Sequence, residues 1–380
     1  MISIAEIEEI KKIATNKFNI NELSGAFGDW GTLIPFIIGY VSIVQMNPAG
    51  IFLCLGITNI ILGIRYNLPL PVQPQKTIGT VAISQKWSAN KVISTGFTTG
   101  IAWLLLGSSK ILNKITKKVP EITVKGIQLG LAFILGWTAL EFFINDYIFG
   151  LISIIIIIIF IKYEKFPTAI ILVMMGIFIL FFLNKFPLQD LFFNPPMLSF
   201  QIPSIENMFV GFLTAGIGQL LLTLTNVMVA SIALIKKLFP DKETDIDSNN
   251  LASNMGIINL FSPFLGGMPL CHGSGGVAAQ YAFGARTGGS MIYEGIIEIV
   301  LGLFFSNFLF NLFVSFPEGI LGAMLLYTAF LLGKVAFTEA KWKAFPIIFI
   351  SALICFFINI TVGFIVGLAL YGIYTKFIES

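Results

Sequence analysis

Long apolar stretches, separated by short polar segments, make up almost the whole chain. Each is long enough to cross, or to reach the middle of, the roughly 30 Å hydrocarbon core of a bilayer as an α-helix. They lie at about 22–43, 49–64, 72–85, 90–107, 121–143, 147–162, 168–184, 207–234, 251–266, 273–284, 289–312, 318–334, 344–359 and 361–376. A polar connection at 186–206 separates the first seven from the last seven. The pattern predicts an all-α integral membrane protein with 14 transmembrane segments.

Two of these stretches begin with proline and glycine spacings that do not suit an unbroken helix. They are Leu68-Pro-Leu-Pro-Val-Gln-Pro-Gln-Lys-Thr77 and Met268-Pro-Leu-Cys-His-Gly-Ser-Gly-Gly276. Proline removes a backbone donor, and each glycine in a helix interior costs about 1 kcal/mol. We therefore expect two short extended segments, each followed by a half-helix that starts within the membrane. Pro74 is expected in the first turn of one half-helix, and the other is expected to begin near Ser274.

A half-helix that begins inside the membrane directs free backbone N–H groups and the positive end of its dipole at the space before it. Such a terminus favours an anion. Paired breaks of this kind, one in each half of a chain, indicate the binding site of a secondary transporter.

The two halves share short sequence matches at a constant offset. Gly56-Ile-Thr-Asn59 recurs as Gly256-Ile-Ile-Asn259, Pro71 recurs as Pro269, and Val119-Pro-Glu121 recurs as Phe316-Pro-Glu318, at offsets of 200, 198 and 197 residues. An odd number of spans per half inserts the second half upside down. The matches predict a 7+7 inverted repeat, with 21–185 as the first repeat and 207–376 as the second.

The basic residues predict the orientation. With the N-terminus inside, eighteen lysines and arginines fall in inner segments and only Lys86, Lys91 and Lys185 in outer ones. Positive charge collects on the cytoplasmic side, so we expect a multi-pass protein of the cell membrane with both termini in the cytoplasm. Residues 1–20 carry isoleucines largely on one helical face and are expected to form an amphipathic helix on the membrane surface.

Composition excludes several other classes of protein. The chain is 56% hydrophobic and 11% charged, with a mean hydropathy of +0.89, whereas roughly 25% of residues are charged in soluble domains. The net charge of +3 does not indicate nucleic acid. Three cysteines in apolar segments and one histidine favour neither disulfides nor a metal site. The sequence contains no recognisable nucleophile–base pair and no Walker loop. We therefore expect that the protein is neither an enzyme nor an ATP-driven pump, and that it binds no cofactor.

Two spans that flank the half-helices in the predicted repeat carry polar residues on one face. Asp29 and Thr32 lie one turn apart in the first span, and Gln219, Thr223 and Asn226 lie near one face of its counterpart. Polar side chains at that depth need partners, and hydrogen bonding between helices explains them about as well as substrate binding. Their position beside both breaks favours a role at the site.

Three acids are candidates for coupling to protons. A carboxylate in the hydrocarbon zone costs several kcal/mol unless it is paired, hydrogen-bonded or protonated, and an ionised Asp29 would repel an anion. Asp29 is therefore either neutralised by neighbours such as Lys76, or it takes up a proton that travels with the substrate. Glu294 and Glu298, one turn apart in a later span, are the alternatives.

The residues around the two breaks are the remaining candidates for binding the anion. At the second break, His272 can donate a hydrogen bond to an oxyanion. The predicted substrate-binding residues at the breaks are Gln73, Gln75, Lys76, His272, Gly273, Ser274 and Gly275, to which Thr32, Gln219, Thr223 and Asn226 are added. A simpler explanation for Lys76 is an amine that extends toward the interface.

At these residues the sequence resembles the molybdate transporter family of the SulP-type anion transporters. The resemblance is carried by Leu23-Ser-Gly-Ala-Phe-Gly-Asp-Trp-Gly-Thr-Leu-Ile-Pro35, Pro71-Val-Gln-Pro-Gln-Lys76, Gln219-Leu-Leu-Leu-Thr-Leu-Thr-Asn226, Pro269-Leu-Cys-His-Gly-Ser-Gly-Gly276 and Gln280-Tyr-Ala-Phe-Gly-Ala-Arg-Thr-Gly288. It implies a core domain of about 21–107 and 207–312 that holds the oxyanion, and a gate domain of about 121–184 and 318–376. It also implies elevator-like movement of the core against the gate.

The resemblance, and not the spacing of residues, selects the substrate. It implies molybdate as the transported anion, with sulfate or tungstate as alternatives. The acids within the apolar spans, and not the resemblance, are the reason to expect a proton as co-substrate. Membrane lipid and a second copy of the chain in a homodimer are the other expected partners. No STAS domain is expected, because the chain stops at Ser380 soon after the last span. An anion channel of the same fold remains open, and so does a nucleobase permease, although such a site is expected to offer carboxylates to the base.

Overall fold

The structure is a computed structural model, and it describes residues 16–112, 119–160, 168–191, 198, 200–240, 242, 246–337 and 342–377. The amphipathic helix predicted at 1–20 lies almost entirely outside these residues. The described chain is mostly helical and contains one two-stranded sheet.

The elements follow one another with short connections. Those before the predicted connection are α2 (Ile20–Ala26), α3 (Trp30–Ser42), α4 (Pro48–Tyr66), β1 (Val72–Pro74), α5 (Lys76–Ser84), α6 (Ala89–Ser108), α8 (Glu121–Asn145), α9 (Tyr147–Phe160) and α10 (Thr168–Phe182). The short helix η1 (Leu188–Leu191) lies within the connection, and α11 (Ile205–Gly211) begins at its end. They are followed by η2 (Phe212–Gly216), α12 (Ile217–Thr225), η3 (Asn226–Ser231), α13 (Ile232–Leu238), α14 (Ser248–Phe261) and η4 (Ser262–Leu265). The last are β2 (Leu270–His272), α15 (Ser274–Ala282), α16 (Gly289–Phe304), α17 (Ser306–Val314), α18 (Glu318–Phe337), η5 (Trp342–Ala344), α19 (Phe345–Phe357) and α20 (Ile360–Phe377).

Both predicted breaks are present. Each consists of a three-residue strand followed by a nine-residue helix, β1 with α5 and β2 with α15. The second half-helix begins at Ser274, as predicted. The role predicted for Pro74 is wrong, because Pro74 ends the strand and α5 begins two residues later at Lys76. Proline suits the end of a short strand, where its missing N–H costs no ladder bond.

Two apolar stretches that were predicted as single spans are interrupted. The first span divides into α2 and α3 around Asp29, where Gly28 approaches the backbone of α15 so closely that an added Cβ would lie 2.7 Å from the Ala279 carbonyl oxygen. The stretch at 289–312 divides into α16 and α17, which bend by 85°. Neither proline nor glycine marks that bend; Phe305, with φ −125° and ψ 12°, interrupts the helix.

Four helices of the described chain are long and apolar enough to cross a bilayer, or five if the bent pair is one span. The four are α4, the continuous run Ile205–Leu238, α8 and α18. Four further apolar helices, α9, α10, α19 and α20, are shorter than these. The count of 14 spans and the inverted repeat stay predictions.

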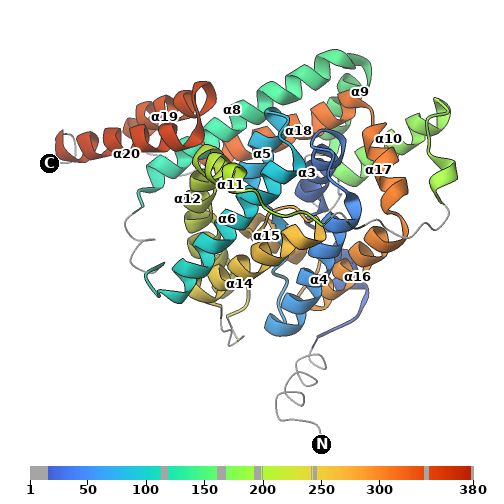
Figure 1. Cartoon of the computed structure of the whole chain (residues 1–380), viewed down its shortest axis with the longest axis horizontal. Helices are drawn as coiled ribbons and strands as arrows, with labels where there is room; N and C mark the ends of the chain where they lie inside the picture. Colours follow the sequence, from blue (N-terminus) through green and yellow to red (C-terminus); the bar gives the residue numbers. More distant parts are fainter. Residues whose placement is uncertain are drawn as a thin grey trace, which may run out of the picture.

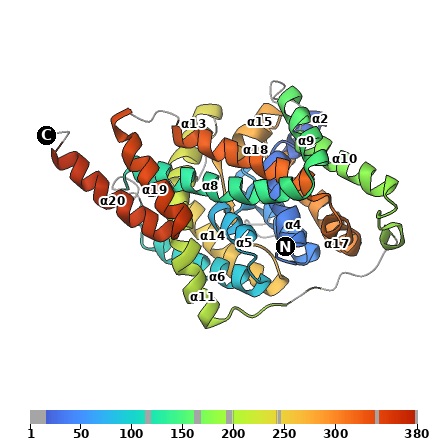
Figure 2. The same cartoon turned by 90° about the horizontal axis from the view of Figure 1, so that it is seen from above.

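Three long helix pairs join segments far apart in the sequence. Helix α4 packs along α16, α6 along α14, and α8 along α18. In Figure 1, helices α8, α9, α18, α19 and α20 lie along one side of the molecule, and α4, α14 and α16 lie on the other, with α5 and α15 between them. Figure 2 shows α8 and α18 side by side from above.

Glycines allow α4 and α16 to touch backbone to backbone. A Cβ added at Gly295 would lie 2.5 Å from the carbonyl oxygen of Gly56, and one added at Gly56 would lie 2.6 Å from that of Gly295. The contact is reciprocal, so a side chain at either glycine would push the two helices apart. Small residues of this kind drive close packing of membrane helices.

The carboxylate of Glu22 joins α2 to the start of α16. One oxygen accepts the backbone N–H groups of Arg286 and Thr287, each at 3.0 Å, and the other accepts that of Ser290 at 3.2 Å. A carboxylate at a helix N-terminus satisfies donors that the helix leaves free and interacts favourably with its dipole.

Substitution of Gly295 by alanine is expected to lower thermal stability in detergent. The added methyl group must push α16 from α4, and overpacking of this kind costs about 1–3 kcal/mol. Gly136→Ala is the matched control, because a Cβ there would meet only the Ala329 methyl at 3.8 Å. Equal melting temperatures for the two variants would contradict the close contact of α4 and α16.

Candidate functional site

The two strands pair with each other in the centre of the molecule and so bring both half-helices to one place. They run antiparallel, with Val72 opposite His272, Gln73 opposite Cys271 and Pro74 opposite Leu270. All six strand residues are buried. The pairing places the N-termini of α5 and α15 at opposite ends of one short sheet, as required of a shared site.

Two asparagines hold the strands in position. Asn59 of α4 accepts the backbone N–H of Val72 at 3.1 Å. Asn259 of α14 accepts the N–H of Leu270 at 2.8 Å and donates to the carbonyl of the same residue at 2.7 Å. These two residues are the equivalent asparagines of the Gly-Ile-x-Asn matches. Their side-chain amides form hydrogen bonds with backbone groups of the strands that are buried away from water.

Gln75 and Gln219, both predicted to bind substrate, bond to protein groups. The Gln75 amide donates to the Leu270 carbonyl and accepts the Thr99 hydroxyl, both at 3.2 Å. The Gln219 oxygen accepts the Thr77 N–H at 2.9 Å, and its nitrogen donates to Thr223 at 2.8 Å. Gln219 therefore occupies a free N–H group in the first turn of α5.

The first turn of α15 is more open. The hydroxyl of Ser274 donates to Oδ1 of Asn226 at 2.9 Å, and Asn226 begins a widened helical turn, η3. A Cβ added at Gly275 would meet nothing within 4 Å, and the same holds for Gly31 of α3. Wide helical turns recur at functional sites. Open space therefore adjoins the N-terminus of α15.

A small cavity lies between the two half-helices and α12. Its lining includes Gln73, Lys76, Gln219, Thr223, Asn226, His272 and Gly273, seven of the predicted residues. The ring of His272 is fully buried beside the carbonyls of Leu70 and Pro71, but neither ring nitrogen forms a hydrogen bond of good geometry with the described chain. Lys76 has no ion-pair partner within the described residues.

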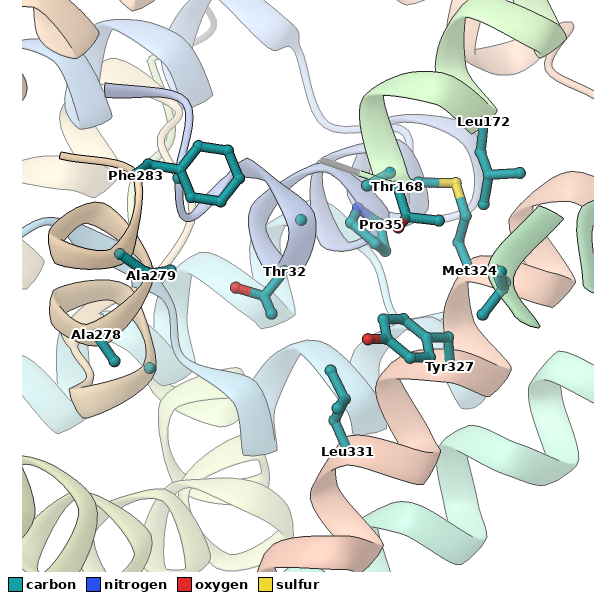
Figure 3. Close-up of a pocket in the computed structure, with 16 residues that line it drawn as sticks. Thr32, Pro35, Thr168, Leu172, Ala278, Ala279, Phe283, Met324, Tyr327 and Leu331 are labelled. Atoms are coloured by element: carbon teal, nitrogen blue, oxygen red, sulfur yellow. The ribbon is translucent and has the colours of Figure 1, made fainter. Parts of the chain in front are cut away.

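A larger cavity of about 490 Å³ lies between α15 and the helices α10 and α18 (Figure 3). Ala278, Ala279 and Phe283 form one wall, and Met324, Tyr327 and Leu331 form the opposite wall. The hydroxyl of Tyr327 points into the space, as does that of Thr32. Gly31 and Gly275 also line it. The cavity connects α15 to helices of the predicted gate.

The three predicted acids are buried near one another, and two of them share a hydrogen-bond network. Gln280 joins two of them, since its nitrogen donates to Glu294 at 2.7 Å and to Asp29 at 3.4 Å. Trp30 donates to Glu294 at 3.1 Å, and Asn59 donates to Glu298 at 2.9 Å. All three carboxyl groups are at most 1% exposed. Within the described residues, no cluster of His, Cys, Asp and Glu is arranged to hold a metal ion.

Gln73 connects this network to the small cavity. Its nitrogen donates to Asp29 Oδ2 at 3.2 Å and to the Thr32 hydroxyl at 2.9 Å. Its oxygen is buried without a hydrogen-bond partner and faces Gly273, where an added Cβ would lie 3.6 Å away. A polar atom of the site is thus left unpaired.

Sequence reasoning missed Gln280, Asn59 and Tyr327 as members or neighbours of the site. Gln280 and Asn59 belong to motifs that were singled out for other reasons, but each has a partner more than 200 residues away in the sequence. Tyr327 carried no signal, because an aromatic residue is ordinary in an apolar helix.

Comparisons with known proteins identify relatives of this chain. Two molybdate transporters of Arabidopsis thaliana are similar along nearly the whole chain: Molybdate transporter 2 is 28% identical, over 92% of this chain and 86% of its own, and Molybdate transporter 1 is 27% identical, over 95% and 90%. A molybdate transporter of Chlamydomonas reinhardtii is 23% identical, over 92% and 90%. These relatives are transporters and not enzymes.

Solved structures show the fold. The transmembrane domain of the cyanobacterial bicarbonate transporter BicA superposes with a TM-score of 0.68 at 14% identity, covering 93% of this chain and 99% of its own. The murine anion transporter Slc26a9, in an inward-facing state, gives 0.72 at 13% identity, covering 99% and 72%. The chain therefore has the fold of multi-pass membrane anion transporters.

The family is shown by a match to a sequence model described as "Molybdate transporter of MFS superfamily". It covers residues 21–135 and 211–332, more than half of the chain. The matched ranges contain both half-helices, the three acids, and every residue named above as lining the small cavity. This chain belongs to the molybdate transporter family.

Proposed function

We propose that the protein is a secondary active transporter of a tetrahedral oxyanion, with molybdate as its main substrate and tungstate and sulfate as weaker ones. The observation that carries the proposal is the open N-terminus of α15, where Gly275 borders free space within the cavity of Figure 3. Free N–H groups at a helix N-terminus bind an oxyanion without a full opposing charge. The choice of molybdate rests on the named relatives.

The proposed binding site is formed mainly by neutral donors. Backbone N–H groups at the start of α15 and the side chain of Thr32 adjoin the open space. Ser274, in the first turn of α15, donates to Asn226, and His272 of β2 lines the small cavity. Lys76, without an ion-pair partner in the described chain, supplies positive charge at the start of α5. Gln219 already occupies one N–H of α5, so α15 is the stronger of the two anion-binding termini.

Transport is proposed to follow an elevator mechanism. The core, about 21–107 and 207–312, would carry the oxyanion past the gate, about 121–184 and 318–376. The large cavity supports this division, because α15 of the core forms one wall and α10 and α18 of the gate form the other. Movement along this boundary would expose the site alternately to the two sides of the membrane.

The 14 spans and the inverted repeat are part of the proposal. An inverted repeat exchanges α4 with α14 and α6 with α16, so that the α4–α16 contact becomes the α14–α6 contact. Both pairs are long and close, and equivalent asparagines hold the two strands. Cytoplasmic termini, location in the cell membrane, coupling to protons and a homodimer complete the proposed arrangement.

Purified protein is expected to bind labelled molybdate, with tungstate and sulfate as competitors and uracil without effect. In proteoliposomes we expect saturable accumulation driven by an inward proton gradient. Accumulation separates a coupled transporter from a channel, which only equilibrates the anion. Competition by uracil would instead indicate a nucleobase permease.

Gln73→Leu and His272→Ser are expected to weaken molybdate binding by about tenfold or more, since each removes a polar group from the lining of the small cavity at the start of α15. Binding is measured by isothermal titration, with unfolding temperature as the test of fold. Asp190→Asn, outside the site, serves as a control for general effects of substitution. Unchanged affinity in both site variants would place the oxyanion elsewhere.

Gly275→Ala is expected to reduce molybdate uptake strongly while leaving the fold intact. The added methyl group meets no protein atom within 4 Å, so it enters only the space proposed for the oxyanion. Gly372→Ala in α20 is the matched control, because it also points into open space but lies away from both cavities. Equal uptake by the two variants would contradict a site at the start of α15.

A further inference from the structure

Gln73 contacts the acid network and lines the small cavity at the start of α15. Its nitrogen bonds to Asp29 and Thr32, and its oxygen, which is unpaired, faces Gly273. An oxygen acceptor that faces an anion repels it. In this arrangement Gln73 therefore disfavours a fully deprotonated oxyanion.

The orientation of the Gln73 amide depends on whether Asp29 accepts or donates. An ionised carboxylate only accepts hydrogen bonds, so it attracts the amide nitrogen, whereas a protonated carboxyl group donates and attracts the amide oxygen. Thr32 imposes no choice, because a hydroxyl can accept or donate. In this arrangement it donates to the Asp29 carbonyl at 3.2 Å and accepts from Gln73.

Gln280 determines which oxygen of Asp29 can carry the proton. In this arrangement the Gln280 oxygen accepts the Ser290 hydroxyl at 2.9 Å, and its nitrogen faces the carboxyl groups of Asp29 and Glu294. That nitrogen donates to Oδ1 of Asp29. Oδ1 is thereby kept as an acceptor, and a proton on Asp29 belongs on Oδ2, the oxygen that faces Gln73.

We propose that protonation of Asp29 rotates the Gln73 amide and thereby turns an acceptor that faces the anion site into a donor. After the rotation, Oδ2–H of Asp29 and the hydroxyl of Thr32 both donate to the Gln73 oxygen. The Gln73 nitrogen then faces Gly273 and donates to the oxyanion. Asp29 acts as a positioning residue, and one proton accompanies each anion. This inference rests on the proposed function and adds a mechanism to it.

Other charged and titratable groups also surround Asp29. Glu294 and Glu298 face it from α16, Lys76 lies at the start of α5, and His272 and Cys271 belong to β2. Among the titratable groups of the described chain, Asp29 alone is linked to the Gln73 amide by a hydrogen bond. This link distinguishes the proposal from a general effect of nearby charge.

The test is the pH dependence of molybdate binding by the full-length protein. In the wild type, affinity should rise by about tenfold for each unit that the pH falls through the titration of Asp29, with about one proton taken up per anion. Proton uptake is measured by titration calorimetry in buffers of different ionisation enthalpy. Asp29→Asn should bind without a pH slope and without proton uptake. In this variant Gln280 holds the oxygen of the introduced amide, so the nitrogen of that amide donates to Gln73 as the protonated acid would.

Gln73→Leu is the second variant and keeps the test informative if D29N is unstable. It should lose affinity and also lose the pH slope, because no amide remains to rotate. A slope that persists in Q73L at reduced affinity would show that the proton acts by charge alone and would overturn the rotation. Asp190→Asn should keep the wild-type slope.

The remaining outcomes separate this inference from the proposed function. If the wild type binds no molybdate at any pH, the proposed function fails. If the wild type binds with a slope that D29N retains, or that is removed only by Glu294→Gln or Glu298→Gln, the function stands and the role of Asp29 is overturned.

Discussion

The structure depends on satisfying backbone groups where there is no water. A half-helix places a helix terminus in the membrane interior. The chain that leads to this terminus runs extended, and an extended chain leaves its backbone N–H and C=O groups unpaired. Pairing β1 with β2 satisfies only the facing edges of the two strands. The outer edges need side-chain amides, which Asn59, Asn259 and Gln75 provide.

This requirement explains why so many amides gather at the centre of an apolar protein. Of the buried amide side chains around the strands, Asn259, Gln75 and Gln219 bond to the backbone of the strands or of a half-helix. Gln280 holds carboxyl groups together instead. Gln73 is different, because its oxygen is buried without a partner. The cost of such a group is tolerated where a ligand or a conformational change supplies the partner.

The sequence predicted local backbone features well and tertiary partners poorly. Proline and glycine act on their own backbone, so the two breaks and the start of α15 at Ser274 were readable from the chain. The bend at Phe305 was not, because no residue there forbids a helix and packing decides the angle. The direction of an amide is also invisible in sequence: Gln73 and Gln75 are two residues apart, yet one bonds to Asp29 and the other to Leu270 and Thr99.

The Glu22 carboxylate has a mechanical consequence for transport. Its three bonds at the start of α16 connect that helix to α2, the first helix of the described residues, and the glycine contact of α4 with α16 adds a second connection. Charge-assisted bonds to a helix terminus are expensive to break where water is scarce. A displacement of α16 is therefore expected to carry α2 and α4 with it as one rigid unit, and in the proposed elevator movement the sliding surface would lie at another boundary.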